Sequence, residues 1–176
     1  MITRDSFSVE EWAGIVSAPA AVGALVVTAD PSGPMGLIGE FRAMTDSLKA
    51  YVEAHAGEGS LMAAMKEYIN TQPSQEEQDQ LQQWAEGQQE QMKANKPKTP
   101  EELHQRIREI VGVAIATLQE KGATEEDLTT FRAMMVSVAE AVANASKEGG
   151  FLGFGGTLVS KKEESILAEI RQELAG

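Results

Sequence analysis

Residues 18–44 read APAAVGALVVTADPSGPMGLIGEFRAM, and this stretch decides the fold class. Its first part, 20–29, is apolar on nearly every side, as in a helix enclosed by other elements. The following Asp30-Pro-Ser-Gly33 fits a type I turn, with aspartate first, proline second and glycine fourth. A second helix, amphipathic, begins near Leu37. The stretch therefore predicts two helices joined by a glycine-rich turn.

A similar pattern recurs near the other end of the chain. Three glycines with the same spacing occur at 33, 36 and 39 and again at 150, 153 and 156, with apolar residues between them. A helix with early carboxylates follows each set. The pattern predicts two pseudo-repeated helix–loop–helix halves, about 1–94 and 99–176, joined by a Lys/Pro loop. The alternative is coincidence in a chain that contains 16 glycines.

Helix-start signals recur along the rest of the chain. Hydroxyl side chains that accept hydrogen bonds from free helix amides precede five runs, at Ser8, Ser60, Ser74, Thr99 and Ser160. Pro19 removes a backbone donor, so the first helix either kinks there or a new helix begins. The sequence predicts an all-α, compact single domain (1–176), a bundle of about seven helices at 9–29, 37–55, 61–70, 75–93, 100–121, 125–148 and 161–174.

The helix expected over 37–55 has apolar residues spaced by four and three positions. This spacing predicts one buried face, made by Leu37, Phe41, Met44, Leu48 and Tyr51.

Composition limits the classes of function. The 176 residues carry a net charge of −12 and include no cysteine. Because no segment is basic, we expect no nucleic-acid partner, and the lack of cysteine excludes disulfides and thiolate metal sites. The most apolar run, 18–29, is shorter than a bilayer span and contains Pro19 and Gly23, and the N-terminus lacks a signal-peptide core. These features predict a cytoplasmic protein with no membrane contact.

Asp30 and Glu40 are candidate ligands for a divalent cation, since they flank one turn and carboxylates bind hard cations together with backbone carbonyls. Glu163 or Glu164 would complete the site from the second pseudo-repeat. The alternative is that Asp30 only fixes the turn through its own side-chain hydrogen bond. No other cofactor is expected, because the chain has only two histidines and no nucleotide-binding motif.

Phe151, Leu152 and Phe154 are candidate interaction residues in the second glycine-rich loop. They either fold back onto the core or, if they are exposed, mark a partner surface. No serine has the histidine and carboxylate context of a nucleophile. The sequence therefore predicts a non-catalytic protein that binds a protein partner or forms a homodimer through an apolar helix face.

The residues Ala29-Asp30-Pro-Ser-Gly33, followed by Glu40, resemble the Ala-Asp-Gly…Glu signature of tellurite-resistance TerB-like helical domains. The stretch Ala145-Ser-Lys-Glu-Gly149 before Ser160 resembles a degraded second copy. The resemblance implies an all-helical domain built from two related halves, a link to stress response and divalent cations at acidic loop residues. We therefore expect a stress-related interaction or scaffold protein, with divalent-cation binding as the alternative.

Overall fold

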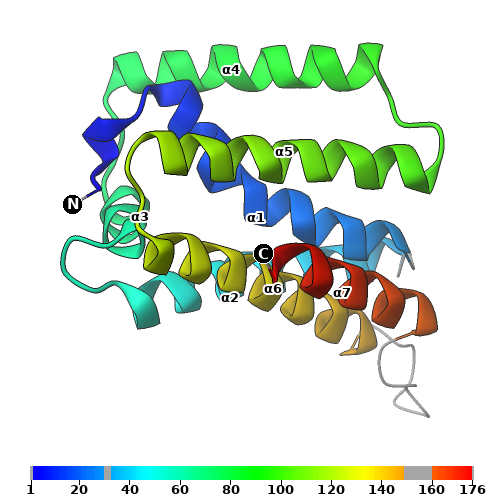
Figure 1. Cartoon of the computed structure of the whole chain (residues 1–176). Helices are drawn as coiled ribbons and strands as arrows, with labels where there is room; N and C mark the ends of the chain where they lie inside the picture. Colours follow the sequence, from blue (N-terminus) through cyan, green and yellow to red (C-terminus); the bar gives the residue numbers. More distant parts are fainter. Residues whose placement is uncertain (1, 30–32, 149–159, 176) are drawn as a thin grey trace. The chain divides into compact units, whose positions relative to one another are not determined.

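Seven α-helices and one 3-10 turn make up the part of the chain that the computed structural model describes, residues 2–29, 33–148 and 160–175 (Figure 1). These ranges contain no strand. The prediction of an all-α fold with about seven helices is confirmed. The elements are η1 (Arg4–Ser6), α1 (Val9–Ala29), α2 (Gly33–His55), α3 (Leu61–Asn70), α4 (Gln75–Ala94), α5 (Pro100–Glu120), α6 (Glu125–Glu148) and α7 (Lys161–Leu174).

Side-chain caps define the starts of the helices. Ser8 Oγ accepts a hydrogen bond from Glu11 N at 3.2 Å, while Glu11 Oε2 accepts one from Ser8 N at 2.8 Å. This reciprocal pair is a capping box, which satisfies amides that the first helical turn leaves free. The predicted caps of α3, α4, α5 and α7 also accept from a backbone amide three residues on, at Ser60, Ser74, Thr99 and Ser160.

Helix α1 is continuous and contains Pro19 in its interior. The alternative of a new helix at Pro19 is therefore wrong, and the apolar run 18–29 continues a helix that begins at Val9. By length and composition α1 is able to cross a membrane, with a mean hydropathy of 1.7 over an 18-residue window. Half of that window is buried inside the protein, which is also the pattern of a core helix.

The helices form two compact units, each with its own buried core. The first unit contains Met1–Ala18 and Ala56–Leu128, and the second contains Pro19–His55 and Thr129–Gly176. The boundaries fall within α1, at Pro19, and within α6. Each unit thus combines segments distant in sequence rather than following the halves 1–94 and 99–176, and the internal duplication stays a prediction.

In the first unit, Asp127 links the starts of two helices. Its Oδ1 accepts a hydrogen bond from Leu61 N at the start of α3, at 2.7 Å. Its Oδ2 accepts from Thr124 N at 3.0 Å and from the Thr124 hydroxyl at 2.8 Å, immediately before α6. The carboxylate is buried, and it fixes the start of α3 relative to the start of α6.

In the second unit, Gly23 allows α1 to lie close to α2 and α6. A Cβ atom at this position would be 2.9 Å from Met44 Cε and 3.4 Å from Val142 Cγ2. The distance of 2.9 Å would require the flexible end of Met44 to move, whereas 3.4 Å is close to ordinary van der Waals contact. Gly23 is thus a position of close approach between α1 and its neighbours.

Candidate functional site

The first turns of α2 have inverted polarity. Leu37, Ile38 and Phe41 are 52, 66 and 67 % exposed, whereas Glu40 is only 1 % exposed. The prediction that Leu37 and Phe41 face the core is therefore wrong. Their spacing does place them on one side of the helix, but in the described structure that side faces solvent. We call Leu37, Ile38 and Phe41 the α2 apolar patch.

This arrangement is unfavourable for an isolated chain. Burial of a leucine, isoleucine or phenylalanine side chain stabilises a protein by about 1.5–3 kcal/mol. The three side chains of the patch are more than half exposed, so the isolated chain lacks much of this stabilisation. The other large hydrophobic side chains that are exposed in the described ranges, Met92 and Val113, lie singly on α4 and α5. Single exposed hydrophobic residues are common, but a contiguous group of three is typical of an interaction site.

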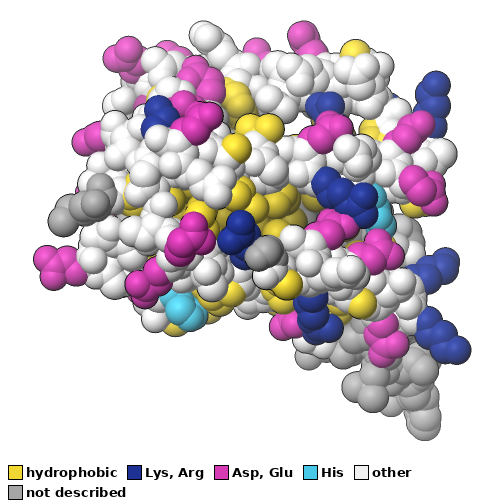
Figure 2. All heavy atoms as spheres, viewed as in Figure 1, with side chains coloured by type: hydrophobic (Ala, Val, Ile, Leu, Met, Phe, Trp, Pro, Cys, Tyr) yellow, Lys and Arg dark blue, Asp and Glu magenta, His cyan; other side chains and the backbone are white. Residues whose placement is uncertain are grey.

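Exposed charged side chains follow the patch in the sequence of α2, on a different part of the helix surface. Arg42 Nε lies 3.6 Å from Asp46 Oδ2, and both side chains are largely exposed. Lys49 and Glu53 follow on the same helix and are also exposed. On the face drawn in Figure 2, acidic and basic side chains are interspersed rather than gathered by sign. The exposed surface of α2 after the patch carries both signs of charge as well.

The structure places only part of the predicted cation site. Asp30 lies outside the described residues, and Glu40 is buried in α2. Glu163 is also buried, and its Oε2 accepts a hydrogen bond from Ser160 N at 2.8 Å as part of a capping box. Glu164 is exposed. The described ranges contain no group of three or more His, Cys, Asp or Glu residues arranged to hold a metal ion.

The three predicted interaction residues of the second glycine-rich loop, Phe151, Leu152 and Phe154, lie outside the described residues. The choice between core plugs and partner surface therefore stays open for them. The α2 apolar patch is a different surface from the one that sequence reasoning nominated. The only sequence signal for it was the spacing of Leu37 and Phe41, which is the same for a buried and an exposed face.

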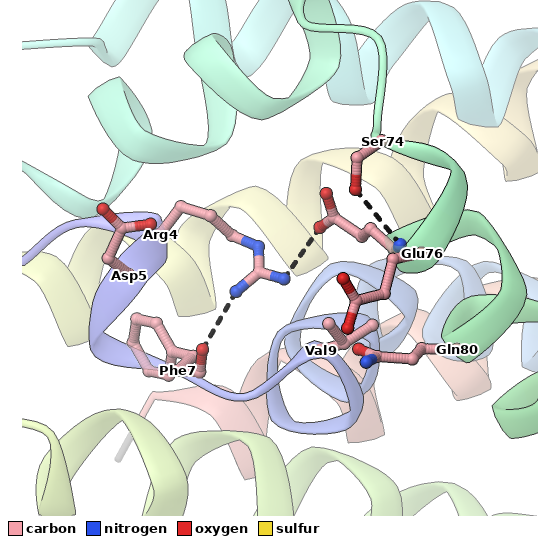
Figure 3. A pocket seen from close by; sticks show the side chains of 8 residues that line it. Arg4, Asp5, Phe7, Val9, Ser74, Glu76 and Gln80 are labelled. Atoms are coloured by element: carbon pink, nitrogen blue, oxygen red, sulfur yellow. Dashed lines mark hydrogen bonds and ion pairs between the residues drawn. The ribbon is translucent and has the colours of Figure 1, made fainter.

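A groove of about 390 Å³ lies in the first unit, between η1 and the start of α4 (Figure 3). Arg4 Nη1 donates to the Phe7 carbonyl at 2.9 Å, and Arg4 Nη2 donates to Glu77 Oε1 at 2.8 Å. Ser74 Oγ accepts from Glu77 N at 3.2 Å, as the cap of α4. The groove is lined by Arg4, Asp5, Phe7, Val9, Ser74, Glu76, Glu77 and Gln80.

The polar groups of this groove hold the fold together. Arg4 is part-buried, and its Cζ lies 5.8 Å from the ring centroid of Trp12, so its charge joins η1, α1 and α4. The Ser74 hydroxyl is already used as a cap. None of the residues that line the groove pairs a nucleophile with a base, which acyl or phosphoryl transfer requires. Sequence reasoning missed the groove because Arg4 and Glu77 are 73 positions apart.

Comparisons of the chain with protein-family models, with curated proteins and with solved structures found no match.

Proposed function

We propose that this chain is a non-catalytic interaction protein that binds a protein partner through the α2 apolar patch. The observation that carries the proposal is the inverted polarity of α2, with Leu37, Ile38 and Phe41 exposed while Glu40 is buried. A partner that covers the patch would recover the stabilisation that the isolated chain lacks. The similarity to TerB-like domains supports a stress-related role for this interaction.

A photo-crosslinking amino acid at position 38 tests the proposal in the full-length chain within cells. Val113 is the matched control, because Ile38 and Val113 are both aliphatic, helical and 66 % exposed. We expect a discrete adduct from position 38, several-fold more abundant than any from position 113. The Phe41→Ser change should abolish it, because it removes a large apolar contact without disturbing a buried side chain. Equal yields from the two positions would contradict the proposal.

A second candidate function is divalent-cation binding by Asp30 and Glu40. Its support is that Asp30 and Glu40 flank one turn, and that carboxylates bind hard cations together with backbone carbonyls. A cation at a hundred times its dissociation constant would stabilise the folded chain by about 2.7 kcal/mol.

The measurement is thermal unfolding with Ca²⁺, Mg²⁺, Mn²⁺ or Zn²⁺ on the unmodified chain and on Asp30→Asn and Glu40→Gln. We expect one cation to raise the midpoint by a few degrees in the unmodified chain and by much less in both variants. Glu164→Gln is the control, because this carboxylate is exposed and its loss should leave the response unchanged. A response that is retained in both site variants, or no response to any cation, excludes this function.

A further inference from the structure

We propose that helix α1 is a hinge, which bends between Gly14 and Pro19, where the chain passes from the first unit to the second. The proposal concerns a different part of the chain from the α2 apolar patch and does not depend on the proposed function. The chain passes between the two units after residues 18, 55 and 128. Of these passages, the one in α1 lies near the middle of its helix.

The other two passages lie at helix ends. One follows His55, the last residue of α2, and leads into a segment that contains Gly57 and Gly59, the latter with a φ of 74°. The other follows Leu128, at the end of the first turn of α6. A helix end is held by fewer backbone hydrogen bonds than a helix interior, so it resists bending less. The stiffness of α1 is therefore the main restraint on bending of the chain where it passes between the units.

Pro19 removes a backbone hydrogen bond from α1 at this passage. Because proline has no N–H group, the carbonyl of Ile15, four residues earlier, lacks its helical donor, and the pyrrolidine ring crowds the same carbonyl. Proline also disfavours helical backbone angles at the residue before it, here Ala18. The boundary between the two units falls between Ala18 and Pro19. The grouping of contacts and the backbone hydrogen bonding therefore divide α1 at the same point.

Two further features weaken the turn of α1 that precedes Pro19. Ser17 Oγ donates a hydrogen bond to the Gly14 carbonyl at 3.0 Å, and a hydroxyl bonded to the preceding turn often bends a helix. Gly14 lies inside the helix, where glycine has more backbone freedom than any other residue. A Cβ atom at Gly14 would meet no neighbouring side chain within 4 Å, so packing does not require glycine there. Gly14, Ser17 and Pro19 thus weaken one short segment, which is where a helix bends.

The distance between two spin labels on α1 tests the hinge in the full-length chain. The chain contains no cysteine, so Glu10→Cys with Thr28→Cys gives two unique attachment sites, and both positions are exposed. These positions are separated by about five helical turns, so in a straight helix they lie on one side, about 27 Å apart. Double electron–electron resonance measures the distribution of this distance. We expect a broad distribution, because the segment between Gly14 and Pro19 bends to different extents in different molecules.

Two substitutions in the labelled chain should stiffen α1. Pro19→Ala restores the backbone N–H, and we expect it to reduce the width of the distance distribution by about half. Gly14→Ala should narrow the distribution too, because alanine has less backbone freedom and its methyl group fits without a clash. Gly14→Ala keeps the test available if Pro19→Ala, at a buried position, does not fold. Gly87→Ala is the matched control, since it makes the same change inside α4, also without a close contact, and should leave the distribution unchanged.

Three results would overturn the hinge. A single narrow distance in the labelled chain without further substitutions means that α1 has one fixed shape. A broad distribution that neither Pro19→Ala nor Gly14→Ala narrows means that the breadth arises outside this segment. An equal narrowing in Gly87→Ala means that the effect reflects a general gain in stability. None of these results bears on the α2 apolar patch, so the proposed function is tested separately.

Discussion

Replacing Trp12 with alanine is expected to lower the free energy of unfolding by about 3–5 kcal/mol. The Trp12 side chain is fully buried in the first unit. Its ring centroid lies 5.2 Å from that of Phe7 and 5.8 Å from that of Tyr68, the latter with the edge-to-face geometry that aromatic pairs prefer. Alanine would leave a cavity between these two rings and remove the surface over which Arg4 lies. Urea unfolding followed by far-UV circular dichroism measures the loss.

Trp84→Ala is the matched control, because it makes the same substitution at the other tryptophan of the chain. Trp84 is only part-buried, on α4, a helix with no fully buried residue. We expect this change to cost less than half as much. Trp12→Phe gives a second comparison. The indole Nε1 of Trp12 has no hydrogen-bond partner in the described part of the protein, so this substitution removes side-chain volume but no hydrogen bond. If Trp12→Ala and Trp84→Ala lower the free energy of unfolding equally, Trp12 is not the centre of this core.

Features that depend on neighbours in sequence could be predicted. The cap at Ser8 and the staple between Phe7 and Trp12 involve residues three to five positions apart, so side-chain chemistry alone specifies them. The same applies to Ser160 and Glu163 at the start of α7. Helix α4 contains few large apolar residues, which is typical of a surface helix, and none of its residues is fully buried.

Features that depend on distant segments could not be predicted. Helical spacing placed Leu37 and Phe41 on one side of α2, but burial of that side depends on which other segment covers it, and periodicity carries no such information. The clash of Pro19 with the preceding turn predicted either a kink in the first helix or the start of a new helix. Helix α1 is continuous through Pro19, so the second of these alternatives is wrong. Each of the two units combines segments that are far apart in the sequence, so no short stretch of sequence indicates which segments pack together.

The candidate sites show the same limit. Asp30 and Glu40 were paired by nearness in sequence, yet burial of Glu40 is a property of the packed second unit. Glu163 was nominated as a ligand and, in the structure, caps α7, a role that its own capping-box spacing also indicates. Asp127 is one of three acidic residues in the first turn of α6. Its hydrogen bond to Leu61, 66 positions away, is invisible in the sequence.

Replacing Asp127 with alanine is expected to lower the free energy of unfolding by about 2–4 kcal/mol. The change removes the acceptor of a buried amide at the start of α3 and the acceptor of Thr124 N before α6, and hydrogen bonds to a buried charged group contribute about 1.5–3 kcal/mol. Asp127→Asn should lower the free energy of unfolding by less, because its amide oxygen can still accept the hydrogen bond from Leu61 N. Urea unfolding measures both losses, and Glu126→Ala, at the exposed neighbour, should change stability by less than about 0.5 kcal/mol.

The pH dependence of the Asp127→Ala effect separates the charge from the packing of this side chain. Burial raises the pKa of Asp127, but the hydrogen bonds from Leu61 N and from the Thr124 hydroxyl and amide together outweigh it, so the pKa lies below its ordinary value of 3.8. A carboxyl group with a lowered pKa in the folded state stabilises that state fully above the unfolded pKa, and this contribution is lost as the pH falls through the folded pKa. The difference in unfolding free energy between the unmodified chain and Asp127→Ala should therefore be constant above about pH 5 and narrow below pH 3.8. A difference that stays constant to pH 2 would mean that Asp127 contributes through its shape, and that its charge does not hold the starts of α3 and α6 together.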